Sequence, residues 1–142
     1  MFVTRVQNAW FTLAIDESDR ILRMRRSAKK MQSLDELVAA MERLIEEIAR
    51  LVPTGQRESW SFLQDMRAGP LLDNPDWEAR QLQLVDRFRG GWRRSALLMQ
   101  TAIGRLQARR LSHSLDQATS DLDRVAVFED EIEALAYLRQ PT

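Results

Sequence analysis

The feature that most constrains the fold is a repeated alternation of short, strand-like apolar runs with amphipathic helical segments. Residues 11–15 carry apolar side chains with a period of two, and residues 21–25 repeat this pattern after a polar turn, which predicts a β-hairpin. Ser33 and Glu36 then form a capping box before an apolar pattern with three- and four-residue spacing that extends to Ile48. A hairpin followed by a long amphipathic helix therefore opens the fold.

The later elements continue the alternation. In chain order they are a strand at 60–64, a helix from Pro75 to the Gly90-Gly91 pair, a strand at 95–99, a weaker helix at 102–114 capped by Thr101, a polar loop at 116–123, a strand at 125–128 and a helix opened by Asp130. In the last helix we expect Ile132, Leu135 and Leu138 to be buried. The order ββαβαβαβα predicts an α/β fold with a mixed, largely parallel sheet and one antiparallel edge.

Length and composition are those of an ordinary globular domain. The chain has 142 residues, of which 44% are hydrophobic and 30% charged, so we expect one domain over 1–142 with a core at about 10–139. The absence of cysteine excludes disulfides and thiolate chemistry and favours a reducing, cytoplasmic location. No apolar run approaches the ~18–20 residues that span a bilayer, so no membrane span is expected.

Charge is balanced overall but unevenly distributed. Basic and acidic residues both number 21, so a dedicated nucleic-acid binder is not expected. Residues 80–110 nevertheless hold eight arginines against one acidic residue, whereas 115–142 hold seven acidic residues against two arginines. Two interpretations remain open: an anion-binding patch, or a solvated surface paired with the acidic tail within one chain or across a homodimer. The patch would consist of Arg93, Arg94, Arg105 and Arg109.

The sequence offers few of the groups that enzymes use. His113 is the only histidine, which excludes metal sites built from two or three histidines. Ser112 and Ser114 are its neighbours on a predicted helix and point in other directions, so a catalytic triad is not expected. The glycine spacing matches no phosphate-binding loop. We therefore expect a non-enzymatic protein without metal or cofactor.

Aromatic residues have two interpretations. Trp60, Trp77 and Trp92, with Phe88, could line a ligand pocket, but packing in the core is the simpler account. Trp10 falls opposite the buried face of the first predicted strand. We therefore expect it to be exposed and to lie at a dimer contact.

Polar residues cluster after the strand at 60–64. In open α/β sheets, ligands and partners gather at the carboxyl ends of the strands. We expect Asp65, Arg67, Asp73 and Asn74 to converge there and to form the partner- or ligand-binding edge. Asp65 could act as a general base or, more simply, stabilise the turn through an ion pair or an Asx-turn. Asn74 is expected to cap a helix, whereas Arg67 has no comparable structural role in the sequence and is expected to be available to a partner.

The element order and four segments resemble the small bacterial STAS/SpoIIAA-like proteins, named after sulfate transporters and anti-sigma factor antagonists. The segments are residues 62–67, 74–76, 101–107 and 127–136. They consist mostly of packing and capping residues, and the resemblance covers roughly residues 10–139.

The resemblance implies a STAS-like fold and a role in protein interaction or regulation. Anti-sigma factor antagonists of this superfamily switch a partner through phosphorylation of a Ser or Thr in the loop after the third strand. The corresponding loop here, residues 67–75, contains neither residue, so we expect an interaction module without that switch. The alternative is a carrier for a small or lipid-like ligand held near Trp60 and Trp77. The expected partners are a second copy of the chain and an unidentified protein or small ligand.

Overall fold

A six-stranded mixed sheet organises the computed structural model, which describes residues 1–70, 72–100 and 125–141. The expected helix at 102–114 with its Thr101 cap and the expected loop at 116–123 lie outside these residues. The strands are β1 (Val3–Gln7), β2 (Phe11–Asp16), β3 (Ile21–Arg26), β4 (Ser61–Asp65), β5 (Arg94–Leu98) and β6 (Val125–Phe128). The helices are α1 (Leu34–Leu51), a short 3-10 helix η1 (Thr54–Ser59), α2 (Pro75–Arg89) and α4 (Glu131–Leu138).

The strands follow one another across the sheet in the order β1-β2-β3-β4-β5-β6. The first three are antiparallel, and β3 to β6 are parallel. The expected α/β class, the β2–β3 hairpin and the largely parallel sheet are therefore confirmed. Strand β1 was not predicted: it is an exposed edge strand in which only Val6 is partly buried, so it lacks the apolar alternation that reveals a half-buried strand.

The starts of α1, α2 and α4 agree with the sequence, because each has a side chain that satisfies free backbone amides. Ser33 accepts a hydrogen bond from the backbone N–H of Glu36, Asn74 accepts from Asp76, and Asp130 accepts from Ile132. Helix α2 ends before Gly90 and Gly91, and Gly91 has a φ of +88°, which favours glycine. The starts of α1, α2 and α4 and the end of α2 are thus determined by local chemistry.

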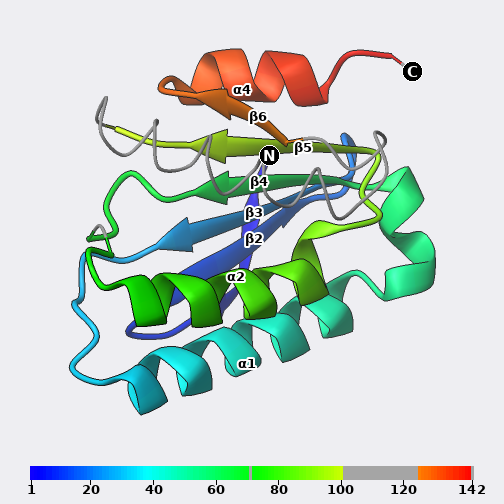
Figure 1. Cartoon of the computed structure of the whole chain (residues 1–142). Helices are drawn as coiled ribbons and strands as arrows, with labels where there is room; N and C mark the ends of the chain where they lie inside the picture. The colour runs from blue at the N-terminus through cyan, green and yellow to red at the C-terminus, as the bar shows by residue number, and fades with distance from the viewer. Residues whose placement is uncertain (71, 101–124, 142) are drawn as a thin grey trace.

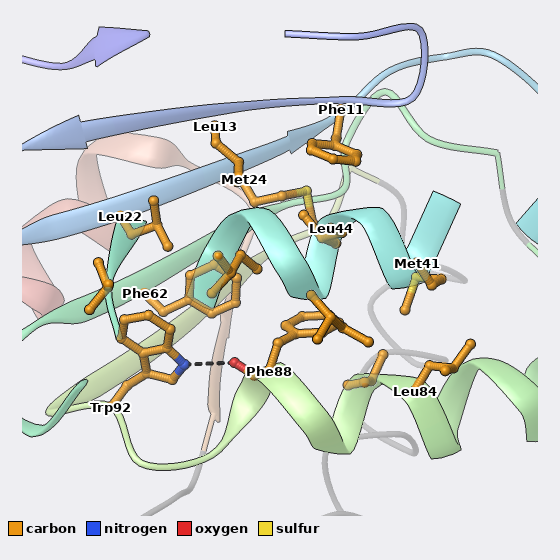
Figure 2. Packing of buried hydrophobic residues seen from close by; sticks show 14 of the residues in the cluster. Phe11, Leu13, Leu22, Met24, Met41, Leu44, Phe62, Leu84, Phe88 and Trp92 are labelled. Atoms are coloured by element: carbon orange, nitrogen blue, oxygen red, sulfur yellow. Dashed lines mark hydrogen bonds between the residues drawn. The ribbon is translucent and has the colours of Figure 1, made fainter. Parts of the chain in front are cut away.

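Helices α1 and α2 cover one face of the sheet, and α4 lies on the other (Figure 1). The α1/α2 face holds the larger core. There the ring of Trp92 stacks on Phe62 with 5.0 Å between centroids, and its indole N–H donates to the Phe88 carbonyl at 2.8 Å (Figure 2). Core packing is therefore confirmed for Trp92 and Phe88.

The α4 face holds a smaller core, in which Ala134 and Leu138 pack against Ile21, Leu63 and neighbouring strand residues. The prediction that Ile132 is buried was wrong, because its side chain is 77% exposed. Ala134 and Leu138, four residues apart, set the buried face. Ile132 lies about 200° around the helix from Ala134, so it points to solvent.

Trp10 was expected to be exposed, and the structure corrects this. The side chain is half-buried and packs against the edge of the larger core. The Lys29 ammonium lies 4.7 Å from its ring centroid, and the Arg26 guanidinium lies 5.8 Å away. A tryptophan held in this way presents less apolar surface for a dimer contact than the strand pattern suggests.

Candidate functional site

The carboxyl ends of β3, β4, β5 and β6 lie at one edge of the sheet, because these strands are parallel (Figure 1). The register places Arg25 beside Asp65 and Asp65 beside Leu98. Gln100 and Glu129 follow β5 and β6 at the same edge. This carboxyl edge is where the sequence predicted the binding residues.

Asp65 ends β4 and is the most buried charged group at this edge, with 5% of its surface exposed. Its Oδ1 accepts from the Arg67 backbone N–H at 3.1 Å and from Arg67 Nε at 3.0 Å, while Oδ2 accepts from Arg67 Nη2 at 2.9 Å. Burial alone would raise the pKa of Asp65, but the hydrogen bonds from Arg67 together with the positive charges of Arg67 and Arg25 outweigh it and hold the pKa below its ordinary value. The turn-stabilising ion pair is therefore confirmed. The expectation that Arg67 has no structural role was wrong.

A second carboxylate, Glu131 in the first turn of α4, extends the ion pair into a network. Its side chain accepts from Arg25 Nη2 at 3.0–3.1 Å and from Arg23 Nη1 at 3.3 Å, and it lies 3.6 Å from Arg67. Arg25 Nε also lies 3.3 Å from Asp65. Three guanidinium groups thus share two carboxylates, and the negative charge of Asp130 also acts on Arg67.

The network borders a hollow of about 490 Å³. We call this the Asp65 hollow; its lining residues are Arg25, Arg26, Asp65, Arg67, Ala68, Gln100 and Glu129. The side chains of Arg25 and Arg67 are 43% and 32% exposed, so both guanidinium groups are accessible from solvent. Ion pairs therefore fix the positions of both guanidinium groups at the hollow, while solvent can still reach them.

A second pocket, of about 340 Å³, lies on the α1/α2 side of the loop after β4. We call it the Trp77 pocket; its lining residues are Arg26, Lys30, Met31, Leu37, Met66, Pro70, Leu72, Asp73, Asn74, Trp77 and Gln81. Trp60 is not among them: it precedes the amino end of β4, whereas Trp77 lies in the first turn of α2. The two tryptophans therefore do not share this pocket.

The four predicted edge residues are thus divided between two sites. Asp65 and Arg67 line the Asp65 hollow, whereas Asp73 and Asn74 line the Trp77 pocket. Arg26 lines both. The Asn74 side chain caps α2, as predicted.

The predicted anion patch is only partly within the described residues. Arg93 donates to the carbonyls of Leu138 and Gln140, and Arg94 donates to that of Pro141, so both arginines bind the chain at the end of α4. Arg105 and Arg109 lie outside the described residues, as does His113. The anion patch stays a prediction.

Arg25, Arg26 and Glu131 are site residues that were not predicted from the sequence. In the alternation over 21–25, Arg23 and Arg25 fall on the face opposite to Leu22 and Met24, but this pattern gives no partner for Arg25. Glu131 pairs with Arg23 and Arg25 across more than a hundred residues of sequence. No local sequence pattern indicates such a contact. An acidic residue in the first turn of a helix that follows a parallel strand nevertheless indicates a position near the carboxyl edge.

Among the described residues, no three His, Asp or Glu side chains are grouped to hold a metal ion. None of the helices in the same residues is both long and apolar enough to cross a membrane. Comparisons with known proteins found no matching family model, no similar curated protein and no similar solved structure.

Proposed function

We propose that this protein is a STAS-like interaction module that binds a partner protein at its carboxyl edge and performs no covalent chemistry. The observation that carries the proposal is the Asp65 hollow, where Arg25 and Arg67 are fixed by carboxylates yet remain accessible. Guanidinium groups oriented in advance bind carboxylates with little loss of side-chain entropy. The partner is expected to present an acidic segment.

The order of strands and helices supports the STAS-like part of the proposal. After β1 and apart from the short η1, the described elements follow the expected order ββαβαβαβα, in which the helix expected at 102–114 lies outside the described residues. The loop at 67–75 contains no Ser or Thr, so binding is not switched by phosphorylation there.

The state of Asp65 supports a binding role over catalysis. A general base works best when its pKa lies near the operating pH, whereas the Arg67 hydrogen bonds lower the pKa of this carboxylate. Asp65 is also engaged on both oxygens. Its role is to orient Arg67 and Arg25.

Self-association belongs to the same proposal, since the basic and acidic segments of two copies would complement each other across a two-fold axis. Sedimentation at low salt should show a dimer whose population falls as salt is added. A monomer under all these conditions would show that the protein does not self-associate.

A pair of matched variants tests the proposed partner site. Ala68 lies exposed in the turn after β4 and lines the Asp65 hollow, whereas Ala49 lies exposed near the end of α1, at the opposite edge of the sheet. Ala68→Trp should fill the hollow without removing any charge. Ala49→Trp makes the same chemical change away from the site.

The measurement is quantitative affinity capture with the wild type and both variants at physiological salt. Acidic proteins retained by the wild type and by Ala49→Trp should be lost with Ala68→Trp. If all three proteins retain the same set, or if Ala49→Trp loses it equally, the carboxyl edge is not the partner site.

A further inference from the structure

The Trp77 pocket combines a cationic rim with an apolar wall. Arg26 and Lys30 supply the rim, while Met31, Met66 and Trp77 belong to the wall. Its volume of about 340 Å³ lies at the small end of the range for small-molecule sites, about 300–1,000 Å³. It lies on the other side of the loop after β4 from the Asp65 hollow, and Arg26 is the one lining residue that the two share.

A narrower cavity of about 40 Å³ extends the pocket toward the core. The two share five lining residues: Arg26, Met31, Leu37, Met66 and Gln81. The narrow cavity is lined further inside by apolar side chains that include Met24, Met41, Leu44 and Phe88. The combined shape is a wide, charged mouth with a thin apolar end.

Methionine is concentrated along this path. Four of the six methionines in the chain, Met24, Met31, Met41 and Met66, line the pocket or its extension. Methionine is unbranched and changes rotamer at low cost, so such walls adapt to an inserted chain. A thin cavity with these walls accepts an aliphatic chain more easily than a ring.

The charge at the mouth favours a monoanion. The Arg26 guanidinium donates to the backbone carbonyls of Ser27 and Lys29, and no carboxylate of the described residues lies within ion-pair distance of it. Burial lowers the pKa of Arg26, which an anion would offset. Lys30 adds a second positive charge, while Asp73 at the same pocket removes one and would repel a dianion.

We propose that the Trp77 pocket binds an unbranched aliphatic monocarboxylate, with the carboxylate at Arg26 and Lys30 and the chain directed into the methionine-lined cavity. The guanidinium of Arg26 donates hydrogen bonds to the carboxylate. The chain displaces water from the apolar wall and gains contacts with the methionines. The ligand class follows from one net positive charge at the mouth and a narrow apolar end.

Decanoate is the probe, with decanol as the uncharged control of the same chain length. Methyl NMR on the full chain labelled at methionine should show saturable shifts for Met24, Met31, Met41 and Met66, while Met99, which lines neither cavity, stays unchanged. Binding should have a Kd of about 1 mM or tighter, as expected for a ligand of this size. Decanol should bind at least about tenfold more weakly, because it cannot pair with Arg26.

Two charge variants and one control complete the test. Arg26→Gln should weaken decanoate binding by about tenfold or more, and the exposed Lys30→Gln by a few fold, with decanol binding unchanged in both. Arg50→Gln, at the far end of α1, should have no effect. If Arg26→Gln does not fold, Lys30→Gln still tests whether positive charge at the mouth of the pocket strengthens decanoate binding. The absence of saturable binding, equal binding of decanol and decanoate, or shifts that spare the four methionines would overturn the proposal.

Discussion

Asp16 and Asp65 occupy equivalent positions in two strands, yet their surroundings differ. Asp16 ends β2 and Asp65 ends β4, and 2% and 5% of their surfaces are exposed. Each accepts a backbone N–H from the turn that follows, from Asp19 at 3.2 Å and from Arg67 at 3.1 Å. Because β2 is antiparallel to β3 and β4 is parallel to it, the two carboxylates lie at opposite edges of the sheet.

The difference lies in the remaining partners. Asp16 accepts from the Ser18 hydroxyl at 3.0 Å, and its other oxygen faces the N-terminal amine at 3.1 Å and Arg139 at 3.8 Å. Asp65 is held by Arg67 and Arg25, which border an open hollow and also reach Glu131. The same turn chemistry therefore completes a local turn at one edge and positions accessible cations at the other.

Replacing each aspartate by asparagine should give the largest difference in stability between the two edges. Asp65→Asn leaves Arg25 and Arg67 with Glu131 as their remaining carboxylate, so we expect it to lower the free energy of unfolding by about 2–4 kcal/mol. Asp16→Asn keeps acceptors for Asp19 and Ser18 and should cost about 1–2 kcal/mol. Urea unfolding followed by tryptophan fluorescence measures both values. Equal losses would mean that the two turns are energetically equivalent.

Acid should act through the same carboxylate. The pKa of Asp65 is lower in the folded chain, despite burial, because of the Arg67 hydrogen bonds, so its contribution to stability is complete above the unfolded pKa of ~4. That contribution is lost as the pH falls through the folded pKa. The wild type should therefore lose stability below about pH 4 more steeply than Asp65→Asn does. Parallel pH profiles for the two proteins would contradict this assignment.

Two glycines offer a steric comparison between the edges. A Cβ on Gly69, in the turn after β4, would lie 2.7 Å from Cγ of Arg26, whereas a Cβ on Gly55 in η1 would meet nothing within 4 Å. Gly69→Ala should displace Arg26 and cost about 1–2 kcal/mol. Gly55→Ala should be neutral or slightly stabilising. Thermal unfolding of both variants checks this, and a neutral Gly69→Ala would show that Arg26 moves without cost.

The smallest expected effect comes from exchanging arginine for lysine. Arg67→Lys keeps the positive charge but loses the paired hydrogen bonds to Asp65, and we expect a loss of about 0.5–1 kcal/mol. Arg139→Lys, whose arginine pairs with the exposed Asp19, should change stability by less than about 0.5 kcal/mol. Denaturant midpoints measured side by side show which variant loses more stability. A larger loss for Arg139→Lys would contradict the stronger structural role of Arg67.

The features that were predicted correctly from the sequence depend on residues that are close together in the chain. Ser33, Asn74 and Asp130 cap helices in the structure as their spacing indicates, because a cap involves only neighbouring residues. The alternation over 21–25 likewise gives the correct faces of β3, with Leu22 and Met24 toward the α1/α2 core.

Features that depend on distant partners were not predictable. Strand β1 pairs with β2 while remaining mostly exposed, so no apolar pattern marks it. The exposure of Ile132 depends on which side of α4 meets β5 and β4. Likewise, the contact between Glu131 and Arg25 depends on α4 returning to the carboxyl edge.

The most direct test of the central claim compares the arginine side chains of the two edges in solution. An acidic probe, tetraglutamate, is titrated into the full chain while the Nε–H signals of Arg25, Arg67 and Arg139 are followed by NMR. We expect saturable shifts for Arg25 and Arg67, which line the Asp65 hollow, and an unchanged signal for Arg139 beside Asp16 and Asp19. Equal shifts at both edges, or a response confined to Arg139, would contradict the claim that the carboxyl edge is the binding edge.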